Sequence, residues 1–228
     1  MTTKLLDCIE QETGPAPRHT VIWLHGLGAD GHDFVPIVPE LLSSHLPPVR
    51  FIFPHAPQRP VTINQGMTMR AWYDIVGFGP EAHEDLDGIR ASRHAIMDLI
   101  VRELERGIPS TQIVLAGFSQ GCAIALYTGL RMDQPLAGII GLSGYLPLRN
   151  MTATEAHPAN ASVPIFMAHG TLDPVVDLSR GEISRDMLLE LGYAPQWHTY
   201  PMPHAVHPQE IADIRDFLVS VLRRDEAL

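Results

Sequence analysis

Short β-rich runs alternate with amphipathic helical stretches along most of this 228-residue chain. The alternation is typical of a mostly parallel sheet covered by helices on both faces, which places the chain in the α/β class. Residues 21–24 and 113–116 are apolar at every position, as strands buried on both faces are. We predict strands at residues 19–24, 49–53, 112–116, 137–142, 164–168 and 196–200, with an antiparallel edge strand at 5–10.

Apolar residues at helical spacing, with charges on the opposite face, mark the segments between these strands. We predict helices at residues 33–44, 85–106, 120–132, 178–191 and 208–223, the last with Pro208 in its first turn. Residues 54–84 and 146–164 lack a clean periodicity, and long irregular segments of this kind usually form lids or binding loops. With no internal repeat or linker, residues 1–228 are predicted to form a single domain with a lid-like loop at 54–84.

Charge and cysteine content exclude several classes of protein. The net charge of −10 argues against nucleic acid and against docking on anionic lipid, since both need a basic surface. Two cysteines, Cys8 and Cys122, are too few for a disulfide-built secreted domain. Residues 1–12 lack the pattern of a signal peptide, and no apolar stretch approaches the ~20 residues that span a bilayer. We therefore expect a cytoplasmic protein without stable membrane insertion.

A candidate nucleophile lies in residues 117–121, which read GFSQG, a G-x-S-x-G motif. The motif follows a predicted buried strand and precedes a predicted helix, which is the setting of a nucleophile elbow. Glycines on both sides prevent side-chain collisions in the tight turn, and the helix N-terminus favours negative charge at Ser119. The alternative is that Ser119 only caps the helix.

An acid and a base follow in the chain order Ser, Asp, His that this arrangement requires. Asp173 lies on the loop after the strand at 164–168, and His204 lies in the middle of the loop after the strand at 196–200. Asp177 and His207 are the competitors. Each lies directly before a predicted helix, so we expect Asp177 to cap its helix and His207 to start the next one.

An oxyanion hole needs two backbone N–H groups that point at the developing negative charge. Gln120, which follows the serine, would supply one. Leu27 would supply the other, because it lies between Gly26 and Gly28 directly after the strand at 19–24. The alternative is that these are ordinary turn glycines.

The motifs together resemble the family of small carboxylesterases that includes acyl-protein thioesterases and lysophospholipases. The resemblance runs from about residue 20 to 222 and rests on LHGLG at 24–28, PHAP at 54–57, RPVT at 59–62, WYD at 72–74, GFSQG at 117–121, HGTLDPVV at 169–176 and YPM at 200–202. It implies the α/β-hydrolase fold, with Ser119, Asp173 and His204 as a catalytic triad and the amides of Leu27 and Gln120 as the oxyanion hole. It also implies that family members are often homodimers.

The resemblance further implies an apolar groove for the acyl chain, with Trp72, Met67 and Val175 in contact with it. The alternative for each of these residues is that it anchors a long loop to the core. One position departs from the family pattern: Pro203 stands where a glycine usually precedes the histidine, which implies a differently shaped loop because proline fixes φ.

We therefore predict a serine carboxylesterase that acts on small-molecule or lipid-like esters through an acyl-enzyme. Acyl-protein thioesterase or lysophospholipase activity is the alternative with the same chemistry, and a non-catalytic binding protein of this fold is a remote one. A peptidase would need extra domains, and a dienelactone-type hydrolase would have cysteine at position 119. No H-E-x-x-H or His-x-His pattern is present, so we predict no metal and no cofactor.

Overall fold

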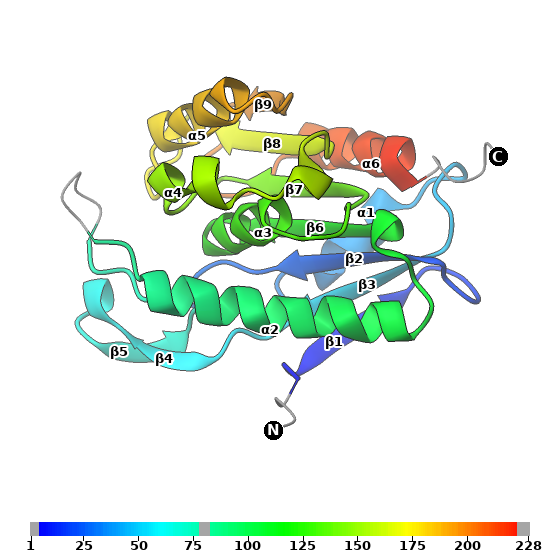
Figure 1. The fold of residues 1–228 in the computed structure, drawn as a ribbon, viewed down its shortest axis with the longest axis horizontal. Coiled ribbons are helices and arrows are strands. Elements are labelled where there is room, and N and C mark those ends of the chain that lie inside the picture. The colour runs from blue at the N-terminus through cyan, green and yellow to red at the C-terminus, as the bar shows by residue number, and fades with distance from the viewer. Residues whose placement is uncertain (1–4, 78–82, 223–228) are drawn as a thin grey trace.

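A computed structural model describes residues 5–77 and 83–222, and its central feature is a seven-stranded sheet (Figure 1). The strand order is β1-β3-β2-β6-β7-β8-β9; β1 is antiparallel to β3, and all other pairs are parallel. The strands are β1 Cys8–Glu12, β2 His19–Leu24, β3 Val49–Pro54, β6 Ile113–Phe118, β7 Gly138–Leu142, β8 Ile165–Gly170 and β9 Gln196–Tyr200. The predicted α/β architecture is confirmed, and all parallel strands end within two residues of the predicted bounds.

Helices cover both faces of this sheet (Figure 1). One hydrophobic cluster joins the sheet to α2 (Leu86–Glu105), α3 (Gln120–Leu130) and α5 (Leu178–Glu190). A second cluster joins the opposite face to α1 (Val38–Leu41) and α6 (Pro208–Leu222). Alternate residues of β2 serve the two faces: Ile22 and Leu24 lie in the first cluster, Val21 and Trp23 in the second. None of the helices within residues 5–77 and 83–222 is long and apolar enough to cross a membrane.

Four predicted segments differ from the structure. The helix predicted at 33–44 is a 3₁₀ turn at Val35–Ile37 followed by the short α1, because Pro36 and Pro39 cannot lie inside a longer helix. The edge strand predicted at 5–10 begins at Cys8 and extends to Glu12, where Arg50 of β3 pairs with Glu12.

The predicted loop at 54–84 is not irregular throughout. It contains a hairpin of β4 (Gln58–Val61) and β5 (Met67–Arg70) joined through a 3₁₀ turn at Thr62–Asn64. The predicted loop at 146–164 contains α4 (Arg149–Glu155) and a 3₁₀ turn at Pro158–Asn160. Residues 78–82 of the first segment, and residue 223 of the last predicted helix, lie outside the described residues.

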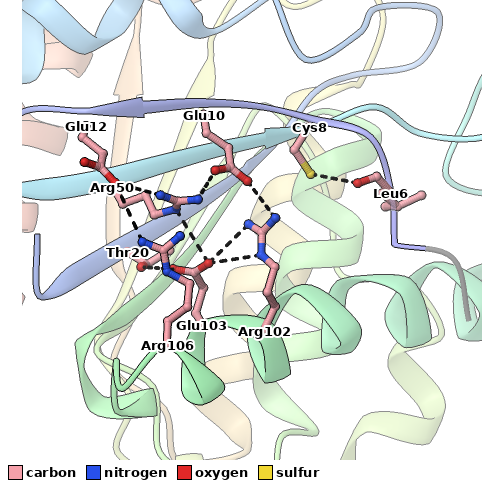
Figure 2. Close-up of polar contacts among 9 residues, drawn as sticks. All are labelled: Leu6, Cys8, Glu10, Glu12, Thr20, Arg50, Arg102, Glu103 and Arg106. Carbon is pink, nitrogen blue, oxygen red and sulfur yellow. Dashed lines mark hydrogen bonds and ion pairs between the residues drawn. The ribbon is translucent and has the colours of Figure 1, made fainter. Parts of the chain in front are cut away.

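An ion-pair network built around the buried carboxylate of Glu103 fastens edge strand β1 to β3 and α2 (Figure 2). Glu103 of α2 is completely buried; it accepts a hydrogen bond of 3.0 Å from the Thr20 hydroxyl and pairs with Arg102 at 3.2 Å. Arg102 also pairs with Glu10 of β1 at 2.7 Å, and Arg50 of β3 pairs with Glu10 as well. A buried carboxylate is tolerated only with such partners, so this network holds the strand edge in register.

Candidate active site

Ser119 occupies a tight turn between β6 and α3. Its backbone has φ 55° and ψ −116°, a conformation that non-glycine residues rarely adopt, and its amide donates to the Leu142 carbonyl at 2.8 Å. A Cβ at Gly117 would collide with the carbonyl of Gly121, and a Cβ at Gly121 would collide with the carbonyl of Leu24. The serine side chain caps no helix amide, so the alternative of a plain helix cap is wrong.

Asp173 and His204 form a hydrogen-bonded pair on the loops after β8 and β9. The His204 Nδ1 lies 2.7 Å from the Asp173 Oδ2. The other carboxylate oxygen accepts the amides of Val175 and Val176 at 2.8 and 2.9 Å, and the Asp173 side chain is fully buried. Because a carboxylate only accepts, His204 donates through Nδ1, which leaves the Nε2 lone pair free to take a proton.

The loops that follow four strands converge at one edge of the sheet. The His204 ring packs against Phe118, the residue before Ser119, with 4.7 Å between the ring centroids. A Cβ at Gly26, after β2, would lie 3.4 Å from the Cβ of Ser119. Parallel strands end at a common edge, so residues far apart in the sequence meet there. Pro203, where the family pattern has glycine, does not prevent the contact between His204 and Asp173.

The two competing residues have structural roles, as predicted. Asp177 caps α5 by accepting the Ser179 amide at 2.9 Å. His207 precedes α6, where its Nδ1 accepts the Gln209 amide at 3.1 Å.

Two backbone amides near Ser119 have no hydrogen-bond acceptor in the part of the chain that the structure describes. Within residues 5–77 and 83–222, neither the Leu27 nor the Gln120 amide donates to another group, whereas Gly28 donates to the Arg70 carbonyl at 2.9 Å. Arg70 belongs to β5, so the hairpin supports the loop that carries Leu27. Free amides beside a serine are suited to hold a developing oxyanion.

His25 holds this loop in shape, a role that the sequence did not predict. The Ala56 amide donates to its Nε2 at 3.0 Å, so the proton must lie on Nδ1, which donates to the Gly26 carbonyl at 2.7 Å. Burial lowers the pKa of His25 to about 4, so the ring is neutral near pH 7. The indole of Trp72 donates to the His25 carbonyl at 2.9 Å.

The three residues expected at an acyl groove differ in environment. Trp72 is completely buried and has the position of a loop anchor. Met67 on β5 is 64% exposed, and Val175 is 53% exposed. Two concave regions lie nearby. The tyrosine recess, of about 290 Å³, is lined among others by Tyr73 and Tyr145, and the His204 cleft, of about 350 Å³, is lined by Phe118 and His204.

Asp30, His32 and His55 form a cluster that sequence spacing did not reveal. Their potential ligand atoms lie within 4.8 Å of one another. However, His55 Nδ1 accepts the Gly31 amide at 3.1 Å, which places the ring proton on Nε2 and leaves no free lone pair for a metal.

A serine in this strained turn, beside a histidine that is bonded to a buried carboxylate, on a mostly parallel sheet covered on both faces, defines an α/β-hydrolase of the serine type. The chain belongs to the phospholipase/carboxylesterase family, whose model matches residues 8–222. It is therefore a serine hydrolase.

Relatives agree with this assignment. The chain is 44% identical over 217 residues to an acyl-protein thioesterase 1 of Neurospora crassa, covering 90% of this chain and 88% of that one. It is 41% identical over 204 residues to an acyl-protein thioesterase 1 of Yarrowia lipolytica, covering 87% and 90%. Among solved structures, Arabidopsis thaliana SOBER1 matches with a TM-score of 0.84 at 29% identity, covering 90% and 99% of the two chains. Zea mays acyl-protein thioesterase 2 matches with a TM-score of 0.81 at 27% identity, covering 94% and 99%.

Proposed function

We propose that Ser119, His204 and Asp173 act as a catalytic triad that hydrolyses acyl esters and thioesters. The observation that carries this proposal is the 2.7 Å hydrogen bond between Asp173 and His204, next to a serine in a nucleophile-elbow conformation. Asp173 fixes the orientation of His204 and stabilises the imidazolium that forms when Nε2 takes the serine proton.

The reaction proceeds in two halves. The Ser119 oxygen attacks the acyl carbonyl carbon while His204 takes its proton, and the amides of Leu27 and Gln120 hold the oxyanion. When the carbonyl re-forms, the bond to the leaving oxygen or sulfur breaks, and His204 returns the proton to that atom. Water then attacks the acyl-enzyme by the same route, which releases the carboxylic acid and restores the serine.

Acyl thioesters are the substrate class that we favour. At 41–44% identity, the named acyl-protein thioesterases support this class. Carboxylic esters and lysophospholipids share its chemistry and remain within the proposal. We place the acyl portion in the tyrosine recess, where the hydroxyls of Tyr73 and Tyr145 lie 2.8 Å apart. A cytoplasmic location and a homodimer stay predictions.

The test compares wild type with Ser119→Ala on p-nitrophenyl esters and acyl thiocholines of increasing acyl length. We expect wild type to hydrolyse both series and the variant to lose at least about three powers of ten in kcat. Circular dichroism and thermal unfolding check that the variant is folded. If the folded variant retains wild-type activity, Ser119 is not the nucleophile.

A further inference from the structure

The His204 cleft is lined largely by apolar side chains, and the proposed function assigns no part of the substrate to it. Phe34 and Ile37 come from the segment between β2 and α1, and Val206 and Ile211 come from the segment that follows His204 into α6. The cleft lies on the α1–α6 face of the sheet. The tyrosine recess is lined by residues from α5 and the loop before α2, which belong to the other face.

The direction of proton transfer indicates which part of the substrate the His204 cleft and the tyrosine recess can each bind. His204 must give its proton to the leaving oxygen or sulfur, so that atom has to lie on the side of the imidazole. His204 lines the cleft. A leaving group that extends into the cleft would keep the leaving atom within reach of His204, with the acyl portion extending the other way.

The charged groups of the cleft have one sign. Asp33 and Glu40 both line it, and no lysine or arginine is among its described lining residues. In the described part of the chain neither carboxylate forms an ion pair, so both charges are open to a ligand. Asp30, which is bonded to His32 at 2.9 Å, also acts electrostatically on Asp33.

We infer that the His204 cleft is the leaving-group site and that it selects an apolar alcohol or thiol that bears a positive charge, such as a quaternary ammonium group. Apolar walls bury the carbon skeleton, while Asp33 and Glu40 attract the cation at the solvent side. This inference rests on the proposed triad and adds the class of leaving group to it.

The test uses two thioesters with the same butyryl group: butyrylthiocholine and S-(3,3-dimethylbutyl) thiobutyrate, its uncharged carbon isostere. Both release a thiol that one colorimetric reagent detects. The measured quantity is the ratio of kcat/KM for the cationic thioester to kcat/KM for the neutral one. This ratio cancels any difference in the folded fraction between variants.

Asp33→Asn combined with Glu40→Gln should lower the ratio at least about threefold, the range expected for exposed charge pairs. Added salt should lower the wild-type ratio and leave that of the double variant nearly constant. Asp216→Asn is the control, because it removes one negative charge from a side chain on α6 that is 73% exposed and lies outside the cleft. It should leave the ratio unchanged.

The experiment distinguishes a failure of the leaving-group inference from a failure of the proposed function. If both thioesters are hydrolysed with dependence on Ser119, and the double variant keeps the wild-type ratio, the leaving-group inference is overturned while the triad stands. If neither thioester is hydrolysed, or hydrolysis does not depend on Ser119, the proposed function itself fails.

Discussion

The side-chain carboxamide of Gln120 forms hydrogen bonds with the backbone of two consecutive residues, Trp72 and Tyr73. Its oxygen accepts the Trp72 amide at 2.8 Å, and its nitrogen donates to the Tyr73 carbonyl at 2.7 Å. Gln120 also carries one of the two amides assigned to the oxyanion hole. A single residue thus connects the start of α3 to the base of the long loop before α2.

Gln120→Leu should therefore destabilise the fold. It leaves the buried Trp72 amide and Tyr73 carbonyl without partners, which costs about 2–4 kcal/mol and lowers Tm by roughly 5–15 °C. Thermal and urea unfolding measure the loss. Gln134→Leu is the control, because Gln134 is exposed. Equal stability of the two variants would contradict the prediction.

Asp173→Asn should abolish most activity without unfolding the protein. Asparagine retains the size of the side chain but not the charge that orients and stabilises the His204 imidazolium, so kcat should fall by about 10⁴. Asp177→Asn is the matched control four residues away. It weakens a helix cap by about 1 kcal/mol at most and should leave kcat unchanged. A large loss of kcat in the control, or none in Asp173→Asn, would reverse the two assignments.

Glu103→Gln tests the network that fastens β1. The change leaves three arginines, Arg50, Arg102 and Arg106, without their shared buried partner, and should lower the free energy of unfolding by about 3–5 kcal/mol. Glu105→Gln on the same helix is exposed and should change stability by less than about 0.5 kcal/mol. Urea unfolding at pH 7 compares them. Thr20 pairs with Ile113 at the start of β6, whereas Ser119 follows the end of β6, so the network lies at the opposite end of the strands and the folded variant should keep its kcat.

Glu210 should make stability fall as pH rises. Burial raises its pKa from 4.5 to about 7, and within the described residues its Oε1 has no hydrogen-bond partner. Between these two pH values the folded state binds more protons than the unfolded state, so the free energy of unfolding decreases with pH and levels off above 7. The full effect is roughly 3 kcal/mol.

Glu210→Gln should remove this dependence and stabilise the protein at pH 8. Glutamine keeps an oxygen for the His207 amide, which Glu210 accepts at 3.0 Å. The neutral His25 acts in the opposite sense between about pH 6.5 and 4, so the informative quantity is wild type minus variant at each pH, from urea unfolding. A difference that does not vary from pH 5 to 8 would show that Glu210 titrates normally.

The main elements and the three side chains of the proposed triad could be predicted from the sequence because each depends on local pattern. Ser119 and Asp173 follow runs of apolar strand residues, His204 follows the more polar strand at 196–200, and the chain order Ser, Asp, His predicts their roles. The hairpin of β4 and β5 could not be predicted from the sequence because each strand has only four residues and Pro60 lies within β4, where a proline argues against a strand. The apolar spacing at 33–44 predicts a longer helix than α1, because the spacing alone does not register the effect of Pro36 and Pro39.

The supporting contacts were not accessible because they join positions far apart in the chain. His25 meets Ala56, Gln120 meets Trp72, and Glu103 meets Thr20, each by a hydrogen bond that only the folded topology creates. No local composition distinguishes these residues from ordinary polar ones. The cluster of Asp30, His32 and His55 could not be predicted either, because His55 lies far from the other two residues in the sequence.

The backbone of α3 is in direct contact with the end of β2 at Gly121. This glycine faces the carbonyls of Leu24 and His25, which leave no room for a side chain. The distance between the serine and the loop that carries Leu27 is thus set by contacts between main-chain atoms, which do not depend on side-chain conformation. Thermal motion of side chains, and most substitutions around the site, leave that spacing alone. Substitutions that line the tyrosine recess or the His204 cleft can therefore change the shape of those regions without moving the serine relative to the Leu27 loop.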